Sequence, residues 1–289
     1  MAGLSAWIHK WLGLQETIVG INERNLRLVY PLNPRKHFEL ADDKVLTKRI
    51  LQEAGVPVAE QLLVIERMGD VDAKWAQMPR VPCAVKPARG SGGGGILVLD
   101  PGPEGTWLKG GQPVAPEVIR RHLGNIIFGV YGFGSDDAVL VETKIVPHPF
   151  FTEIYPKGVA DVRIIVKEGK LVMGMLRIPT DASDGRANLH QGAIGVGLDL
   201  DTGQLRQGYD GQKHLTHHPD SGVKLAGRQL PNWAQTLDIC RKVDAAFPLG
   251  YLGIDIAYDA TVGPLVLEIN VRPGLQIQNV NQTGLKQVL

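Results

Sequence analysis

GIDIAYD at residues 253–259 and GPLVLEINVRPG at residues 263–274 make up the stretch that decides the fold. Over most of their length both runs alternate apolar side chains with polar or small ones, as a β-strand with one face on a core does. The short connection between them predicts an antiparallel hairpin. One face of this hairpin is a core face, because its side chains are large and apolar: Ile254, Ile256, Leu267 and Ile269.

The polar face of the hairpin carries two carboxylates. A turn centred between Thr261 and Val262 would place Asp255 opposite Glu268, and Asn270 would then point to the same face as Glu268. Facing carboxylates repel each other unless a cation or a proton lies between them. Two carboxylates and an amide supply the hard oxygen ligands that Mg²⁺ prefers, so we expect a magnesium site here. The alternative is a polar face whose charges are hydrated.

A glycine-rich loop is the second informative feature. Residues 90–95 read GSGGGG and lie between the predicted strands 83–87 and 96–99, which indicates a flap at the tip of a hairpin. Consecutive glycines expose backbone N–H groups that can surround phosphate oxygens, although such a run is more often only a flexible hairpin. Lys86 favours phosphate binding, because its ammonium could neutralise the same oxygens. Lys44 opens a predicted helix, where a lysine is ordinarily just an exposed charge.

The remaining sequence predicts an α+β fold without internal repeats. Helical periodicity covers residues 42–54, 116–129 and 231–247. Strand-like runs cover residues 62–65, 83–87, 96–99, 138–142, 161–167, 171–177 and 192–198, with the hairpin itself at 252–258 and 264–270. We expect mainly antiparallel sheets in two lobes, with an N-terminal segment at 1–41, a small lobe at 42–140 and a large lobe at 141–289.

Composition argues against several classes of protein. The chain has 289 residues and a formal charge of +1, which gives no reason to expect nonspecific binding to nucleic acid. Cys83 and Cys240 form no disulfide framework and no zinc spacing, so a reducing, cytoplasmic location is the simpler expectation. An amphipathic N-terminal helix, too short to span a bilayer, is predicted to pack on the protein or to dock on a membrane or a partner. Its apolar residues at helical spacing are Trp7, Ile8, Trp11 and Leu12.

Together these features have the order and spacing found in ATP-grasp proteins, from about residue 40 to residue 275. The matching positions are Asp43-Lys44, Val85-Lys86-Pro87, the glycine flap, Val141-Glu142, Asp161-Val162-Arg163, Arg177, Asn188 with Gly192, Asp255, and Glu268-Ile269-Asn270. The chain resembles the alpha-L-glutamate ligase relatives within the ATP-grasp superfamily. It is similar to the ribosomal-protein glutamate ligase family and to sugar-transfer-associated ATP-grasp proteins. The resemblance implies two α+β lobes that clamp ATP and Mg²⁺ in an ATP-dependent carboxylate–amine ligase.

The resemblance also implies roles for individual residues. The nucleotide would be bound by Lys44, Lys86, Gly90, Ser91, Gly92, Gly93, Gly94, Glu142, Thr143, Lys144, Ile145 and Asp161. One or two Mg²⁺ ions would be held by Asp255, Glu268 and Asn270. Arg177 and Asn188, with Lys86, would stabilise the charge that develops on the transferring phosphoryl group. Substrate contacts would come from Arg163, Arg272 and His190.

The match to this superfamily is incomplete at the N-terminus. Most relatives carry a full α/β domain before the helix that begins near Asp43, whereas only about 40 residues precede it here. These predict a helix and a short arm around Leu26–Tyr30. We therefore expect the acceptor site to come from residues 200–230, a second subunit or a protein partner.

The substrates are expected to be a carboxylate, such as the amino acid glutamate, and an amine on a small molecule, a peptide or a protein. A small-molecule kinase of the same fold and a nucleotide-binding regulator without turnover are the alternatives.

Overall fold

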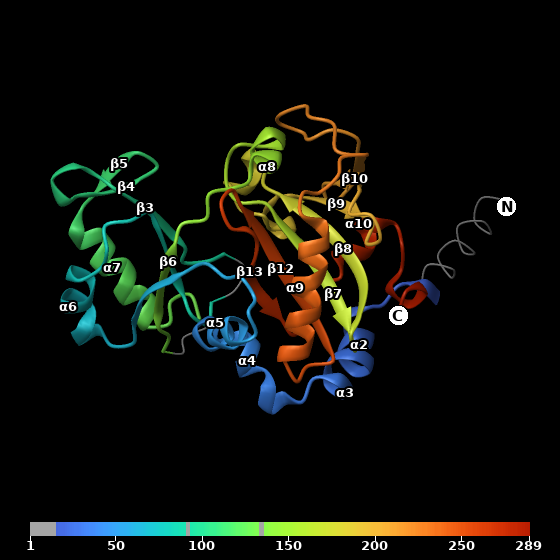
Figure 1. Ribbon diagram of the computed structural model, residues 1–289, viewed down its shortest axis with the longest axis horizontal. Helices are drawn as coiled ribbons and strands as arrows, with labels where there is room; N and C mark the ends of the chain where they lie inside the picture. The colour runs from blue at the N-terminus through green and yellow to red at the C-terminus, as the bar shows by residue number, and fades with distance from the viewer. Residues whose placement is uncertain (1–15, 91–92, 133–135) are drawn as a thin grey trace, which may run out of the picture.

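The computed structural model describes residues 16–90, 93–132 and 136–289 of the chain. Two sheets lie side by side, the smaller at the left of Figure 1 and the larger at its centre, and each has its own hydrophobic core. The N-terminal helix predicted from Trp7, Ile8, Trp11 and Leu12 lies outside the described residues, as do the flap residues Ser91 and Gly92. Over the described ranges, no helix has the length and apolar character needed to cross a bilayer.

The smaller sheet has six strands, all paired antiparallel. From edge to edge they are β1 (Gln61–Ile65), β6 (Val139–Thr143), β2 (Cys83–Pro87), β3 (Leu97–Pro101), β4 (Trp107–Lys109) and β5 (Gln112–Val114). Helix α7 (Pro116–Ile127) packs on β2 and β6 and also contacts α6 (Val71–Ala76). Its apolar side chains Ile119, Leu123 and Ile126 recur at helical spacing, and this stripe is what the helix buries.

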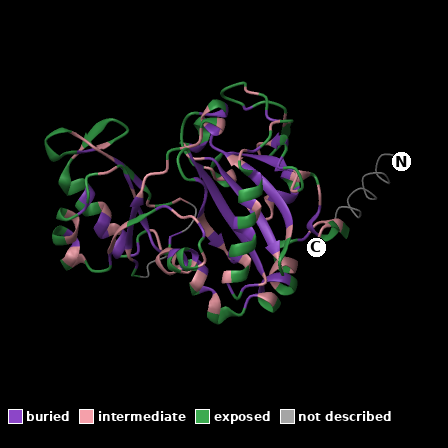
Figure 2. Ribbon diagram, in the orientation of Figure 1, coloured by how far each residue is buried: buried purple, intermediate pink, exposed green. Residues whose placement is uncertain are grey.

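The larger sheet has seven strands, again all antiparallel. Their order is β11 (His214–Leu215), β10 (Leu205–Tyr209), β9 (Ile194–Leu198), β8 (Lys170–Ile178), β7 (Asp161–Lys167), β12 (Tyr251–Asp259) and β13 (Gly263–Asn270). Helix α9 (Trp233–Ala246) runs across one face and contacts β7 and β13 (Figure 1). Helix α8 (Pro149–Ile154) lies near the top of this lobe in Figure 1, and helix α10 (Gln276–Asn281) contacts β8, β9 and β10. Strand β12 is buried along its whole length, so it forms the centre of this lobe (Figure 2).

The register of the β12–β13 hairpin confirms the expected pairing of its carboxylates. Asp255 lies opposite Glu268 in the ladder. The next pair towards the turn joins Ile256 to Val266, so Leu267 is an extra residue on β13 and forms a β-bulge. The bulge is what keeps Glu268 and Asp255 on one face although the turn is not where we expected it.

The turn of this hairpin is centred on Thr261, not between Thr261 and Val262, because Asp259 pairs with Gly263. The Asp259 carboxylate accepts hydrogen bonds from the backbone N–H groups of Thr261 and Val262 at 2.8 and 3.0 Å. Gly263 adopts a φ of 83°, a conformation that favours glycine. The hydrogen bonds from these backbone N–H groups to the Asp259 side chain thus fix the position of the turn. Strand periodicity alone does not reveal such bonds.

The helix expected over residues 42–54 is α5 (Lys44–Glu53), and a separate short helix, α4 (Glu39–Asp42), precedes it. Asp43 separates them with an extended backbone and accepts hydrogen bonds from Val45 N and Leu46 N at 3.0 and 3.1 Å. A side chain that caps a helix N-terminus starts a new helix rather than continuing the old one. Lys44 is therefore the first residue of α5.

The N-terminal segment is helical where we expected an arm. Residues Leu26–Tyr30 lie within a continuous set of turns formed by α2 (Ile21–Arg24), the π-helical stretch η1 (Asn25–Val29) and α3 (Tyr30–Leu32). Asn33, just after this segment, donates from Nδ2 to the Tyr251 carbonyl at 2.6 Å and accepts from the Tyr251 N–H at 2.9 Å. These two bonds tie the segment to the end of β12.

Two small hairpins lie in stretches where the sequence pattern predicted no strands. Strands β4 and β5 lie at residues 107–114, and β10 and β11 lie within residues 200–230. Strands of two to five residues are too short to show a clear alternation of apolar and polar side chains.

Candidate functional site

A buried cluster of arginines and carboxylates crosses three neighbouring strands of the larger sheet. Asp255 on β12 is 1% exposed. Arg163 on β7 donates to both Asp255 oxygens, from Nε at 2.7 Å and from Nη2 at 2.6 Å. Arg177 on β8 donates to Asp255 Oδ2 at 2.8 Å and to the two oxygens of Asp161 at 2.5 and 2.7 Å. The planar guanidinium groups match the carboxylates in pairs, which compensates the cost of burying four charges.

Strand β13 extends this cluster with Glu268 and Asn270. Asn270 Nδ2 donates to Asp255 Oδ2 at 3.1 Å, and Glu268 faces Asp255 across the ladder. Burial alone would raise the pKa of Asp255, but Arg163 and Arg177 hold it well below its usual range. Burial raises the pKa of Glu268, and the negative charge of Asp255 raises it further. An added cation would therefore stabilise the ionised form of Glu268.

The donor set on these strands fits magnesium in its chemistry. Within the ranges that the structure describes, no three His, Cys, Asp or Glu side chains are grouped as a metal site would need. The predicted ligands are two carboxylates and one amide, Asp255, Glu268 and Asn270, and both oxygens of Asp255 already accept hydrogen bonds from arginines. All three offer hard oxygens, and Mg²⁺ commonly keeps several waters and uses substrate phosphates instead of an all-protein cage.

A second buried charge cluster lies in the smaller lobe, at the end of β6. Glu142 is 4% exposed and forms ion pairs with two lysines. Lys86, from the neighbouring strand β2, contacts Glu142 Oε1. Lys48, from helix α5, contacts Glu142 Oε2 at 2.6 Å. Burial would raise the pKa of Glu142, but Lys86 and Lys48 outweigh it and keep the group ionised.

Lys44 links the two lobes electrostatically. Its Nζ donates to the Gly90 carbonyl at 2.5 Å, at the point where the glycine flap begins. Burial lowers the pKa of Lys44, Glu268 of the larger lobe opposes this effect, and Lys86 of the smaller lobe adds to it. The ammonium of Lys44 thus lies within electrostatic reach of the candidate metal ligands and of the lysine on β2.

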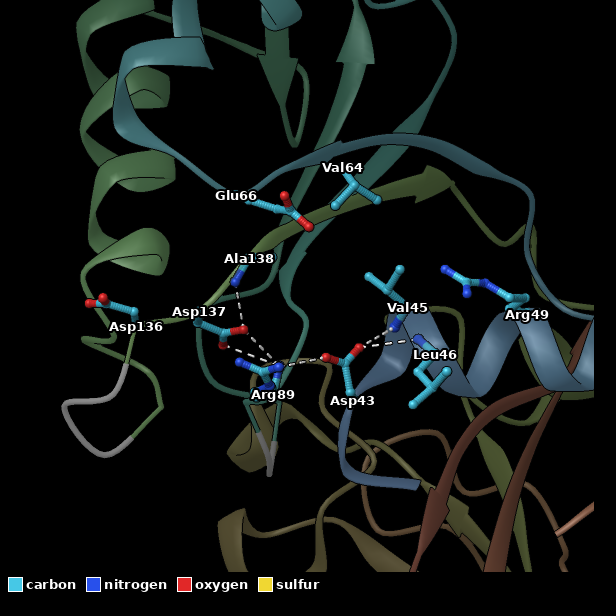
Figure 3. A pocket seen from close by; sticks show the side chains of 10 residues that line it. All are labelled: Asp43, Val45, Leu46, Arg49, Val64, Glu66, Arg89, Asp136, Asp137 and Ala138. Atoms are coloured by element: carbon cyan, nitrogen blue, oxygen red, sulfur yellow. Dashed lines mark hydrogen bonds and ion pairs between the residues drawn. The ribbon is translucent and has the colours of Figure 1, made fainter. Parts of the chain in front are cut away.

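The base of the flap is held to helix α5 by a compact polar network (Figure 3). Arg89 donates from its backbone N–H to both oxygens of Asp137, at 3.0 and 3.1 Å, and its Nη2 lies 3.1 Å from Asp43 Oδ2. The backbone N–H of Lys44 donates to the Ala88 carbonyl at 2.9 Å. Asp43, Arg89 and Asp137 line a cavity of about 370 Å³. It lies between the start of α5, strand β1 and the residues just before β6.

The described part of the flap has the backbone that its glycines allow. Gly93 and Gly95 adopt φ values of 76° and 75°. A side chain at Gly95 would meet the ring of Tyr131 at 2.7 Å, whereas a side chain at Gly93 would approach Arg186 of the larger lobe at 3.9 Å. The flap therefore reaches from the smaller lobe towards the loop that carries Arg186. Gly94, between them, is exposed.

The three predicted residues after Glu142 are Thr143, which ends β6, and the next two residues, Lys144 and Ile145. Thr143 Oγ1 accepts a hydrogen bond from Glu60 N at 3.1 Å. Lys144 Nζ contacts both oxygens of Asp100, at 2.8 and 2.9 Å. Ile145 is half-buried.

The predicted substrate residues do not all lie in one place. Arg163 belongs to the buried cluster described above. Asn188 caps the short helix η6 (Leu189–Gln191) and accepts from the backbone N–H of His190 at 3.0 Å, and His190 itself is exposed. Arg272 is exposed at the surface and lies over the ring of Phe38 at 5.1 Å.

Sequence reasoning missed two residues that the geometry now makes candidates. Lys48 follows Lys44 by four positions on α5, and residues four apart share one face of a helix, so the spacing could have revealed it. Arg186 stands two residues before Asn188 and is the side chain of the larger lobe nearest to where Gly93 would carry one. Its proximity depends on how two distant loops fold, which spacing along the chain does not show.

Solved structures that resemble the chain include enzymes of low sequence identity to it. The biotin carboxylase of Campylobacter jejuni, solved as a β,γ-ATP complex, aligns with a TM-score of 0.52, 15% identity, 85% of this chain and 43% of its own. The N5-carboxyaminoimidazole synthetase of Staphylococcus aureus, complexed with ADP, gives 0.47, 14%, 82% and 46%. The D-alanine–D-alanine ligase of Bacillus anthracis gives 0.44, 16%, 86% and 61%. The chain thus spans less than two thirds of each of these solved chains, and the first of them supports a shared fold.

A comparison with curated proteins finds no match to this sequence. The family described as sugar-transfer associated ATP-grasp matches residues 23–289. This range includes both sheets, the glycine flap and the clusters around Asp255 and Glu142. The chain therefore belongs to the sugar-transfer associated ATP-grasp family.

Proposed function

We propose that the chain is an ATP-dependent carboxylate–amine ligase. The observation that carries this proposal is the position of Lys44, which contacts the base of the glycine flap and lies within electrostatic reach of both Lys86 and Glu268. In this proposal, two ammonium groups and the flap face a set of carboxylates across the nucleotide site. A triphosphate with bound Mg²⁺ has the complementary charges: oxygens for the lysines and a cation for the carboxylates.

In this proposal the smaller lobe and α5 bind the nucleotide. Lys44 and Lys86 neutralise phosphate oxygens, and the N–H groups of the flap cover them. Glu142 and the backbone of Thr143–Ile145 line the adenosine side of the site. Asp161 acts through Arg177, because its two oxygens hold the guanidinium in place.

The larger lobe would hold the metal and the reacting groups. Mg²⁺ would be bound by Glu268 and Asn270, with Asp255 behind them, and would supply positive charge next to the phosphates. Arg177 and Asn188 would stabilise the charge on the transferring phosphoryl group. Arg163, Arg272 and His190 are candidates for substrate contacts, although the guanidinium of Arg163 already forms two bonds with Asp255.

The proposed reaction has two steps. An oxygen of the substrate carboxylate forms a bond to the γ-phosphorus while the bond between that phosphorus and the β,γ-bridging oxygen breaks, so ADP leaves and an acylphosphate remains. The amine nitrogen then attacks the acyl carbon, inorganic phosphate leaves with its bonding electrons, and the nitrogen loses a proton. Positioning and positive charge carry most of the catalysis in such transfers, which suits a site rich in lysine and arginine.

The proposed substrates are a carboxylate and an amine. We propose an amino acid such as glutamate as the carboxylate, and an amine on a small molecule, peptide or protein as the acceptor. The family description, sugar-transfer associated, makes amino sugars and sugar acids further classes to test. Residues 200–230, which carry β10 and β11, are the part of the chain that we propose for acceptor binding.

The proposal is tested by ADP release from ATP and Mg²⁺ in a matrix of carboxylates and amines, with product masses measured. A ligase releases ADP and phosphate only when a carboxylate and an amine are both present. The mass of its product equals the sum of the two substrate masses minus the mass of one water. Phosphate retained on an acceptor would show a kinase instead. Glu268→Gln, which removes one charge without changing size, is expected to abolish the release, and full activity in this variant would reject the metal assignment.

A further inference from the structure

We propose that Lys48 is a positioning residue: it balances the charge of Glu142, so that Lys86 can direct its ammonium at a nucleotide phosphate. This inference deepens the proposed function and rests on it. Lys48 does not itself touch the nucleotide in this proposal. It acts through Glu142, which lies between the two lysines.

The geometry shows a carboxylate shared between two cations from different elements. The exposed fraction is 5% for Lys48, 4% for Glu142 and 8% for Lys86. Water therefore has little access to the three charged groups. Lys48 Nζ lies 2.6 Å from Glu142 Oε2, and Lys86 Nζ contacts the other oxygen, Oε1. Each oxygen of Glu142 therefore has its own lysine.

The position of Lys48 is fixed independently of Glu142. Its Nζ also donates to the Ala59 carbonyl at 2.6 Å, in the segment that connects α5 to β1. A lysine whose ammonium contacts both a backbone carbonyl and a carboxylate is restricted to few side-chain conformations. Lys86, by contrast, stands on β2 four residues before the flap and close to Lys44, where the phosphates would lie.

The charges explain why two lysines are needed. If Glu142 had only Lys86 as partner, the carboxylate would draw that ammonium fully onto itself, because a buried anion without a second cation is costly. Burial lowers the pKa of Lys48, and the negative charge of Glu142, whose Oε2 lies 2.6 Å away, opposes this effect. With Lys48 present, Glu142 remains compensated while Lys86 shares its ammonium with a phosphate.

A packing role alone is the competing explanation. Lys48 would then serve only to hold the connection at Ala59, and its loss would weaken folding without changing which part of a nucleotide is recognised. Removing the negative charge of Glu142 separates the two explanations. If charge balance matters, a neutral residue at 142 should release Lys86 and offset the loss of Lys48.

The experiment measures the affinity of AMPPNP with Mg²⁺ and of adenosine by calorimetry and competition. The proteins are wild type, Lys48→Met, Glu142→Gln and the double variant. We expect Lys48→Met to weaken AMPPNP binding about tenfold while adenosine binding changes by less than about twofold. We expect the double variant to bind AMPPNP more tightly than Lys48→Met alone. Losses that simply add would overturn the proposal, because additive losses are what two independent sites give.

Two further variants keep the test decisive. Lys48→Gln retains a donor for Ala59 and Glu142 but lacks the charge, so it serves if Lys48→Met fails to fold, and we expect the same loss of AMPPNP affinity. Lys74→Met is the matched control, since Lys74 also donates to a backbone carbonyl of this lobe, that of Val64 at 3.1 Å, away from Glu142. We expect wild-type binding from it.

The wild-type protein separates the two proposals. If wild type does not bind AMPPNP, the proposed function fails. If wild type binds it and Lys48→Gln binds it equally well, only the role of Lys48 fails.

Discussion

Arg177 donates to Asp161 and to Asp255 from one guanidinium, so a side chain on β8 joins carboxylates on β7 and β12. A lysine ammonium is a compact charge and does not match two carboxylates in a planar fork. We expect Arg177→Lys to lower ATP-dependent turnover about 100-fold, as loss of a preorganised charge contact typically does. Steady-state ADP release with the identified substrate pair measures this.

The control for Arg177 is Arg206→Lys, because Arg206 pairs with Asp199 in an exposed position. It should retain turnover. Equal activity of Arg177→Lys and wild type would contradict a catalytic role for the guanidinium. Chemical denaturation of both variants shows whether any loss comes from unfolding.

Glu268 makes stability depend on pH in a defined direction. Folding raises its pKa above the ordinary value of 4.5, so the folded protein binds this proton more tightly than the unfolded chain does. The resulting stabilisation is fully present below pH 4.5 and is lost as pH rises through the folded pKa. We expect the free energy of unfolding of wild type, relative to Glu268→Gln, to fall as pH rises from 4.5 towards neutrality.

Urea denaturation of both proteins across this pH range measures the difference. Mg²⁺ with ADP should restore the wild type at neutral pH more than the variant, because a bound cation favours the ionised carboxylate. A difference between the two proteins that does not vary with pH would show that folding does not raise the pKa of Glu268.

The terminal hairpin was the part of the site that the sequence predicted best. Alternation with a period of two places Asp255, Glu268 and Asn270 on one face, and the structure confirms the facing pair of carboxylates. The same reasoning could not locate the Asp259 turn or the Leu267 bulge, because both depend on local hydrogen bonds rather than on periodicity.

Partners across the sheet were harder to predict than positions along a strand. Nothing in the spacing of Arg163, Arg177 and Asp255 shows that they meet, since this needs the strand order β8-β7-β12. The spacing of four residues from Lys44 was a signal for Lys48 itself. Its partner Glu142, however, lies 94 residues later in the sequence, and no spacing along the chain shows that the two side chains meet.

Gly95 lies at the end of the flap, where an alanine would be disfavoured both by the backbone conformation and by a steric clash. Its φ is 75°, and an added Cβ would lie 2.7 Å from the Tyr131 ring. Its carbonyl also lies 2.9 Å from His122 Nε2. We expect Gly95→Ala to shift this end of the flap and to weaken AMPPNP binding, measured by calorimetry.

Gly105→Ala is the matched control for the flap. Gly105 has a φ of 76°, but an added Cβ would meet nothing within 4 Å. Both variants should lose about 1 kcal/mol of stability from the backbone conformation. Only Gly95→Ala should also lose nucleotide affinity, and the same affinity in both variants would argue against a role for the flap in binding.

Asp137 anchors the other end of the flap. It is buried, and its two oxygens accept from Arg89 N, while Oδ1 also accepts from Ala138 N at 2.7 Å. Asp137→Asn replaces one acceptor by a donor that would face the Arg89 N–H. We expect this change to cost about 1–3 kcal/mol of stability, as an unsatisfied buried group does. Faster hydrogen exchange at the Arg89 amide would report the loss locally.

Asp136→Asn tests whether this effect belongs to the anchor rather than to charge alone. Asp136 is the preceding residue and is exposed, so the same loss of one carboxylate should leave stability and exchange at Arg89 unchanged. Arg89 also contacts Asp43, which precedes Lys44 at the start of α5. Loss of the hydrogen bonds from Arg89 to residue 137 should therefore change the position of Lys44. We therefore expect Asp137→Asn to weaken AMPPNP binding, and full affinity in a folded variant would show that nucleotide binding does not need the flap base to be fixed.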